Sequence, residues 1–274
     1  MASKIYQSRY SNFSPIASFI LLGALASSCL GEIQDKHEES EKKKAFPRIE
    51  HVGLVHPNIL AIEFINGKRI PGKYVPYIAA EGDEIKVQEK KPYSRTLHRN
   101  GQEIGYIVGP EGDQLRFHDT FEGVELEAKD YFLEYLYSVR SNDDPAYKQS
   151  QPPVKTALKS KPLDFVQSPG WNFDFANRGT LYLYLNEPLK AGNTYRVESK
   201  GPLFEQLSFN FNPEKKRSNS VHVSHAGFRP NDPVKFATVS AWNGTGGGAE
   251  FPDELAFSLV DAESGETVYQ GESK

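Results

Sequence analysis

In several short runs from Ile59 onward, apolar residues recur at every second position, and turn-forming residues separate the runs. The clearest is "GTLYLYL" at 179–185, where Leu181, Leu183 and Leu185 fall on one face and Tyr182 and Tyr184 on the other. This alternation is typical of a β-strand. Polar turn residues follow at 190–193, so the region predicts two neighbouring strands.

Two other segments carry hairpin signals. The run Ile59–Ile65 is followed by Asn66-Gly67, and such a pair between extended runs favours a tight type I′ turn. The segment 102–115 contains Gly-Pro-Glu-Gly-Asp between two extended runs. We therefore expect a hairpin at each place.

Two segments are ambiguous by pattern alone. Residues 129–145 fit either a helix or a strand, and their aromatic content and the turn at 143–145 favour a strand. Residues 149–169 contain four prolines and little periodicity. They are either a domain linker or a long surface connection inside a sandwich.

The C-terminal region follows a charged joint at 212–220, where we place a domain boundary. It holds short extended runs at 221–223 and 234–242, a glycine-rich loop at 244–248 and a hairpin over 255–269. These are about four strands, whereas an immunoglobulin-like sandwich needs about seven. The predicted fold is all-β, with a β-sandwich domain at 46–217 and an incomplete immunoglobulin-like sandwich at 218–274.

The N-terminus predicts export. Lys4 and Arg9 precede the apolar stretch Ile16–Ala26, which has the length of a signal peptide and is too short to span a bilayer. Ala24-Leu25-Ala26 fits a signal peptidase site. Leu25–Cys29 resembles a bacterial lipobox, although Ala26 stands where leucine is usual.

Cys29 is the only cysteine, so the chain has no intrachain disulfide and no cysteine-ligated zinc fold. Its position favours lipidation. We predict a signal peptide at 1–28 and a charged tether at 29–45. The expected location is the bacterial cell envelope, as a lipoprotein, or the exterior, as a secreted protein. Any membrane contact would then be through the lipid anchor.

The charge and the motifs of the chain argue against nucleic-acid binding, a metal site and a phosphate-binding loop. The formal net charge of -4 does not favour nucleic-acid binding. His222 and His225 are three residues apart in an extended segment, so they point to opposite faces, and the zinc-protease motif is missing. The loop 244–248 lacks the lysine of a phosphate loop. We predict no metal and no cofactor.

No catalytic residue can be identified from the sequence. No Gly-x-Ser-x-Gly motif occurs, and the close acidic pairs lie in turn-like contexts where carboxylates are usually solvated. Those pairs are Glu111 with Asp113, Glu122 with Glu125, and Asp143 with Asp144. Whether the chain is an enzyme therefore stays open.

Aromatic residues are the better candidates for a binding surface, because sugar rings stack on aromatic faces. "WNFDF" places Trp171, Phe173 and Phe175 on one face, and we expect that stripe to be core. Tyr182 and Tyr184 are expected to face solvent. The candidate carbohydrate-binding residues are Trp171, Tyr182 and Tyr184.

The segment "VHVSHAGFRPNDPVKFATVS" resembles the opening of the N-terminal immunoglobulin-like domain of glycoside hydrolase family 9, the cellulase-type enzymes. Ser224-His225 and Phe228 depart from the usual Asn-Gln and Tyr, and the resemblance covers about a fifth of the chain. The later segment "V-Y-x-G" at 268–271 also fits. The residues that match in the first segment are Gly227-Phe228, Pro230, Asn231-Asp232-Pro233, Lys235 and Ala237-Thr238-Val239.

In that family the domain is not catalytic and packs against an (α/α)6 barrel that carries an Asp base and a Glu acid. The resemblance implies the non-catalytic N-terminal portion of an exported polysaccharide-degrading glycoside hydrolase, supporting a barrel absent from this chain. The alternatives are a surface lipoprotein that binds glycans without catalysis and a structural array of immunoglobulin-like domains. The expected partner is a polysaccharide such as a β-glucan, and we expect a monomer.

Overall fold

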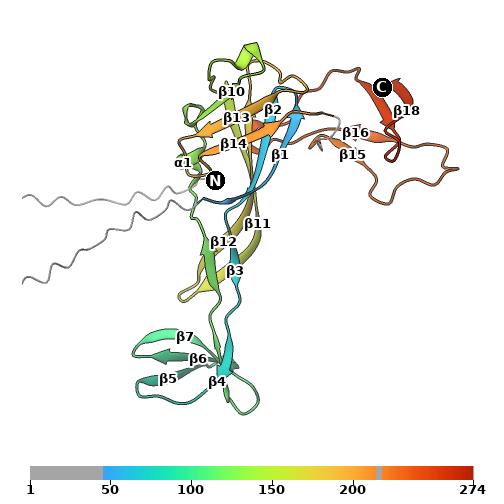
Figure 1. The fold of residues 1–274 in the computed structure, drawn as a ribbon. Coiled ribbons are helices and arrows are strands. Elements are labelled where there is room, and N and C mark those ends of the chain that lie inside the picture. The colour runs from blue at the N-terminus through green and yellow to red at the C-terminus, as the bar shows by residue number, and fades with distance from the viewer. Residues whose placement is uncertain (1–45, 214–217, 274) are drawn as a thin grey trace, which may run out of the picture. The chain divides into compact units, whose positions relative to one another are not determined.

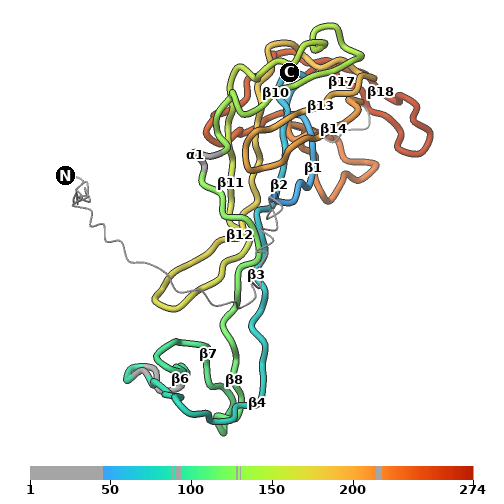
Figure 2. Tube along the Cα trace, turned by 60° about the vertical axis from the view of Figure 1, so that its left-hand side comes forward, coloured from blue at the N-terminus to red at the C-terminus, as the bar shows by residue number. Residues whose placement is uncertain are grey.

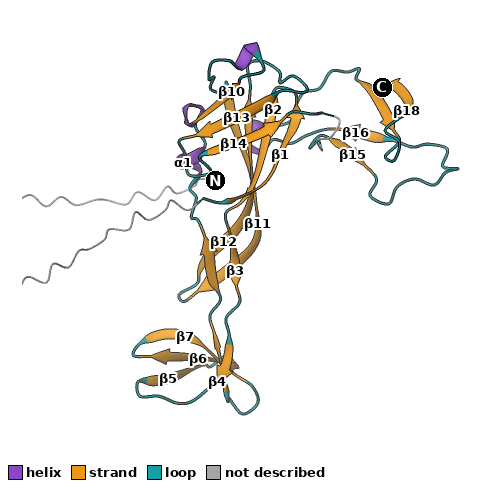
Figure 3. Cartoon of the chain, viewed as in Figure 1, coloured by secondary structure: helices purple, strands orange, loops and turns teal. Residues whose placement is uncertain are grey.

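The computed structural model describes residues 46–213 and 218–273, and these form an almost wholly β structure (Figure 1, Figure 3). Strands take up 52% of the residues and helical turns 5%, arranged in several antiparallel sheets. The all-β, sandwich-type fold is confirmed. The predicted signal peptide at 1–28, the tether at 29–45 and Cys29 lie outside the described residues.

A four-stranded antiparallel sheet organises the structure, with strand order β1-β2-β12-β11. Strand β12 pairs with β11 along its whole length and with β2 over its second half. Its first half therefore extends beyond β2 as a hairpin with β11. The bounds are β1 (Arg48–His56), β2 (Ile59–Ile65), β11 (Lys155–Ser168) and β12 (Asn172–Tyr184).

A three-stranded sheet in the order β10-β13-β14 covers one face of this sheet. Its strands are β10 (Tyr137–Ser141), β13 (Thr194–Ser199) and β14 (Gln206–Asn210). The main core lies between the two sheets, because every second side chain of each strand points toward the facing sheet. It includes Leu60, Ile62, Phe64, Tyr137, Val139, Leu181, Leu183, Leu185, Tyr195 and Val197.

The other face of the four-stranded sheet carries a smaller apolar cluster. Ala61, Ala157 and Tyr182 lie here, and Ala241, Ala249 and Phe251 of the C-terminal region pack against them. Tyr182 is only 4% exposed. The predicted alternation of leucines and tyrosines is therefore confirmed, but the expectation that Tyr182 faces solvent is wrong because a segment sixty residues later covers it.

Beyond Asn66 the chain continues into a two-stranded ladder rather than turning back. β3 (Gly67–Ile70) pairs with β9 (Thr120–Gly123), and neither Asn66 nor Gly67 adopts positive φ. The predicted type I′ hairpin is wrong. Asn66 is buried instead, and its side chain amide donates to the carbonyls of Val124 and Phe175.

The residues between β3 and β9 form a five-stranded antiparallel sheet in the order β4-β8-β7-β6-β5 (Figure 2). Its small core contains Leu97, Ile107 and Leu115. The predicted hairpin at 102–115 is confirmed as β7 and β8. The bounds are β4 (Tyr74–Pro76), β5 (Asp83–Gln88), β6 (Lys91–Arg99), β7 (Gln102–Val108) and β8 (Gln114–Phe117).

Both ambiguous segments fold differently from the expectation. Residues 129–145 begin with short helical turns, and only 137–141 form a strand. Residues 149–169 are neither linker nor loop, because most of them form the long edge strand β11. Pro162 fits there because it lies at a register shift on an edge strand. The short turns are α1 (Ala128–Tyr131), η1 (Glu134–Leu136) and η2 (Pro145–Tyr147).

The C-terminal region contains four short strands in two separate ladders, in agreement with the expected number. The first ladder pairs β15 with β16 and the second, the predicted hairpin, pairs β17 with β18. Nearly all their residues are exposed. The bounds are β15 (Val221–Val223), β16 (Ala237–Val239), η3 (Gly244–Gly246), β17 (Ala256–Val260) and β18 (Thr267–Glu272).

The glycine-rich segment 244–248 packs on the main sheet. The hydroxyl of Thr245 accepts a hydrogen bond from the amide of Leu158, and the Lys155 ammonium donates to the carbonyl of Gly246. A Cβ on Gly244 would meet the Leu158 carbonyl oxygen at 2.0 Å. These glycines therefore permit a close backbone approach, which the expectation of a flexible loop did not foresee.

Candidate functional site

Four aromatic rings form an exposed row on the β11–β12 hairpin, which we name the hairpin stripe: Phe165, Trp171, Phe173 and Phe175. Their exposed fractions range from 40% for Phe173 to 77% for Trp171. Neighbouring ring centroids are 5.8 to 6.4 Å apart. The expectation that Trp171, Phe173 and Phe175 form core is wrong.

The stripe is exposed because this end of the hairpin packs only one face. Val166 and Ala176, on the opposite face, are buried. That face contacts the β3–β9 ladder, where the Arg69 guanidinium also donates to the Asp164 carboxylate over 2.9 Å. Side chains alternate along a strand, so the remaining positions point away. Trp171 has positive φ in the turn, where it follows Gly170.

The other two residues predicted from sequence lie elsewhere. Tyr182 is buried beneath the C-terminal region, so its ring offers no surface. Tyr184 is half-buried, its hydroxyl accepts from the Asn243 amide over 2.9 Å, and the Lys155 ammonium lies 5.0 Å from its ring centroid. Of the three candidates, Trp171 alone presents an open aromatic face.

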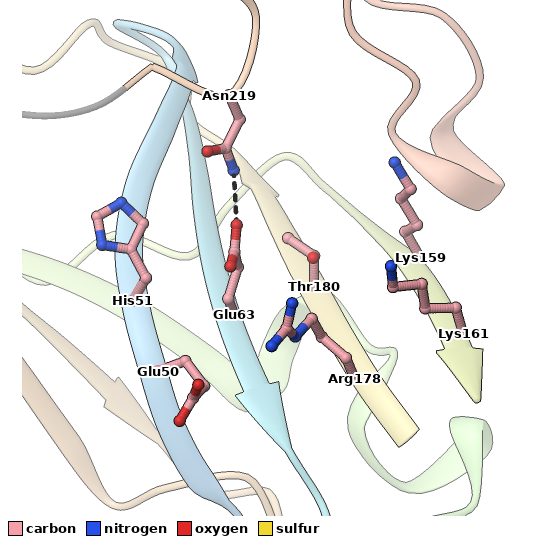
Figure 4. A pocket seen from close by; sticks show the side chains of 8 residues that line it. All are labelled: Glu50, His51, Glu63, Lys159, Lys161, Arg178, Thr180 and Asn219. Atoms are coloured by element: carbon pink, nitrogen blue, oxygen red, sulfur yellow. Dashed lines mark hydrogen bonds between the residues drawn. The ribbon is translucent and has the colours of Figure 1, made fainter. Parts of the chain in front are cut away.

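A second surface lies on the four-stranded sheet, beyond the part that the C-terminal region covers. It is a groove of about 490 Å³, which we name the charged groove (Figure 4). One cross-strand row forms its floor, because His51 pairs with Glu63, Glu63 with Thr180, and Thr180 with Lys159. The lining residues are Glu50, His51, Glu63, Lys159, Lys161, Arg178, Thr180 and Asn219.

The acidic side chains of the groove already have partners. Glu50 forms an ion pair with Arg48 at 3.0 Å, and Glu63 accepts a hydrogen bond from the Asn219 amide over 3.2 Å. These contacts hold the two carboxylates on the β1–β2 side of the groove. Figure 4 shows them apart from the two lysines of β11.

The cationic side chains have no such partners. Within 46–213 and 218–273, no ion pair is formed by Lys159, Lys161 or Arg178. The Arg178 Nε and the His51 Nε2 are buried and have no hydrogen-bond partner in the same ranges. The groove therefore holds unsatisfied hydrogen-bonding atoms, which cost free energy when nothing occupies it.

The groove continues toward the C-terminal region through a neighbouring hollow of about 400 Å³. The two hollows share Glu63, Lys159, Thr180 and Asn219. Trp242 lines the second hollow and is 62% exposed. An open indole face therefore stands beside the charged side chains.

Two members of the acidic pairs named from the sequence, Asp144 and Glu122, have charged partners in the structure. Asp144 is fully buried and accepts from the Tyr195 hydroxyl at 2.8 Å and from the Lys190 ammonium at 3.0 Å. Burial raises the pKa of Asp144, but these hydrogen bonds outweigh it and leave the pKa below its ordinary value. Glu122 forms an ion pair with Lys68.

The two histidines lie in a strand and in a turn as expected, but the strand histidine, His222, is exposed rather than half-buried. His222 is on β15 with its Nε2 2.9 Å from the Ser240 carbonyl oxygen, and His225 follows in a turn. In the part of the chain that the structure covers, no three His, Cys, Asp or Glu side chains are grouped so that they could hold a metal ion. In the same residues, no helix is long and apolar enough to cross a membrane.

Sequence reasoning missed the charged groove. Lys159 and Lys161 alternate on one strand, and Arg178 and Thr180 alternate on another, which is a visible signal. What the sequence did not reveal is the register that places these pairs side by side with Glu63.

Comparison with known proteins adds no relative: no family model, no curated protein and no solved structure matches the chain.

Proposed function

We propose that this chain is a non-catalytic, glycan-binding portion of an exported polysaccharide-degrading protein. The hairpin stripe carries the proposal. Four neighbouring rings on the open face of a hairpin expose the flat apolar surface on which sugar rings stack through their C–H groups.

A rigid base supports this role. Three of the four stripe residues lie in the β11–β12 ladder, in which Phe165 pairs with Phe175 and Gln167 with Phe173, and Trp171 lies in the turn that joins the two strands. Val166 and Ala176 on the opposite face of the hairpin are buried, so the backbone that carries Phe165, Phe173 and Phe175 is already ordered before a ligand binds. A row of rings with centroids about 6 Å apart suits an extended polymer better than a single sugar.

The parent enzyme is supported by the family 9 resemblance of residues 221–271 and by the exposed apolar side chains of that region. Val223, Phe257, Leu259 and Val268 are each at least 43% exposed. Phe257 and Leu259 of β17 lie beside Tyr269 of β18, and exposed apolar side chains gathered on paired strands are typical of surfaces that pack against another module. We propose a catalytic barrel of the same protein as that module.

Affinity electrophoresis in gels containing soluble β-glucan tests glycan binding. We expect the wild type to be retarded and the triple variant W171A/F173A/F175A to lose most of the retardation, because each ring contributes stacking area. The side chains are exposed, so the variant should fold, and circular dichroism checks this.

The matched control is Tyr135→Ala, which removes an aromatic side chain that is 69% exposed and lies outside the stripe. It should leave retardation unchanged. Absence of retardation of the wild type on every neutral glucan would contradict the proposal, and so would equal losses in the control and the triple variant.

A further inference from the structure

We infer that the charged groove binds a sugar unit bearing an oxyanion, either a uronate carboxylate or a sulfate ester, so that the glycan bound is acidic. The inference rests on the proposed function only in taking the ligand to be a glycan. The groove itself is a separate surface, on the part of β11 and β12 nearest to β2.

The first argument is the placement of like charges. Lys161 lies directly opposite Arg178 in the β11–β12 ladder, and Lys159 is two residues away on the same face of β11. Like charges directly opposite each other destabilise a sheet. Among the described residues no carboxylate pairs with these three cations, so a bound anion would relieve the repulsion.

The second argument is the unsatisfied Arg178 Nε, which is buried at the groove. A guanidinium presents several N–H donors in a plane and binds carboxylate or sulfate oxygens through two of them. With ammonium groups from Lys159 and Lys161 beside it, the groove can surround one oxyanion with charged donors from two strands.

The third argument distinguishes a sugar from a free inorganic anion. The opposite side of the groove holds the carboxylates of Glu50 and Glu63, which repel an anion but accept hydrogen bonds from hydroxyl groups. An acidic sugar has both kinds of group on one ring. Trp242, in the adjoining hollow, offers an aromatic face for the next sugar along the chain.

The test compares the K159Q/K161Q variant with the wild type on three polymers: polygalacturonate, a sulfated dextran and neutral dextran. Both lysines are exposed, so the chain should fold. We expect the wild type to bind at least one acidic polymer, and the variant to bind it about 10-fold or more weakly, which corresponds to the loss of a charge-assisted hydrogen bond. Added salt should reduce binding of the wild type more than that of the variant.

The matched control is K73Q/K148Q, which removes the same two charges from exposed positions outside the groove. Equal losses in this control would show non-specific charge attraction and overturn the inference, and so would unchanged binding by K159Q/K161Q. Preference for polygalacturonate identifies a carboxylate ligand, and preference for the sulfated polymer a sulfate.

The two proposals fail separately. If the stripe variant binds neutral glucan as well as the wild type does while K159Q/K161Q loses acidic binding, the stripe proposal is wrong and the groove inference holds. If neutral binding depends on the stripe and no acidic polymer binds more tightly than neutral dextran, the groove inference is wrong.

Discussion

At the scale of single residues, Asp83 is the carboxylate with the largest number of described partners in the five-stranded sheet. The Arg99 guanidinium donates to it from Nε at 2.6 Å and from a second nitrogen at 3.0 Å. The Ala80 amide donates at 3.0 Å and the Tyr77 hydroxyl at 3.3 Å. The Arg99 hydrogen bonds are the largest cause that lowers the pKa of Asp83, to about 2.

Because of this lowered pKa, the stability of the folded protein decreases as the pH falls. Because the folded-state pKa is below the unfolded value, the stabilisation by Asp83 is fully present above about pH 4 and is lost as the pH falls toward about 2. We expect the urea midpoint of the wild type to exceed that of Asp83→Asn near neutral pH. The difference should shrink through this window, and a difference that is constant with pH would contradict the assignment.

Asn66 shows why the Asn66-Gly67 pair did not form the predicted hairpin turn. Its side chain oxygen accepts from the Asn177 amide at 2.7 Å while its amide group serves Val124 and Phe175. A buried side chain with partners on β12 and beyond β9 gains more from these hydrogen bonds than from a turn. All its partners lie more than fifty residues away, so no local pattern indicates them.

At the scale of elements, β12 determines where both surfaces lie. Its second half lies between β2 and β11 and contributes Arg178 and Thr180 to the charged groove, whereas its first half carries Phe173 and Phe175, two of the four rings of the hairpin stripe. Gly179 lies in the second half, between the groove residues Arg178 and Thr180. It lies directly opposite Phe64, whose buried ring covers it.

Gly179→Ala should therefore destabilise the protein. The added Cβ would lie 2.2 Å from the ring of Phe64, which is 2% exposed and has little room to move. We expect a loss of about 1–3 kcal/mol in the free energy of unfolding, measured with urea. Gly248→Ala is the control, because a Cβ there meets nothing within 4 Å and the effect should stay within about 0.5 kcal/mol.

The sequence predicted elements better than it predicted exposure. The alternation of residue types correctly placed Leu181 and Leu183 on the opposite face of the strand from Tyr182. Turn residues correctly located the hairpins at 102–115 and 255–269. Which face meets solvent depends on what covers it. Tyr182 is covered by a distant segment, while Phe173 and Phe175 are left open because only one face of their hairpin is packed.

At the scale of the whole molecule, the described residues belong to one compact unit that begins at Lys44. The main core lies entirely within the first domain predicted from sequence, between residues 49 and 211. The C-terminal region instead packs against that domain. Ser218 forms an isolated β-bridge with Leu54, and the Ser220 hydroxyl donates a hydrogen bond to the Val55 carbonyl.

Residues 218–274 expressed alone should therefore lack a cooperative thermal transition. Their strands bury almost none of their own apolar side chains, and separation removes the contacts of Ala241, Ala249 and Phe251 with the main sheet. Calorimetry of this fragment and of residues 46–217 gives the comparison, with a transition expected only for the second. A sharp transition in the first would identify a self-contained domain.

The β3–β9 ladder has a consequence for protein engineering. The chain departs at Ile70 and returns at Thr120, and these two residues are direct partners in the ladder. The intervening sheet has its own core of Leu97, Ile107 and Leu115. The five-stranded sheet can therefore be replaced, between Ile70 and Thr120, by a tight turn, a reporter domain or a foreign binding loop. Such a replacement would remove no backbone hydrogen bond from the β-sandwich.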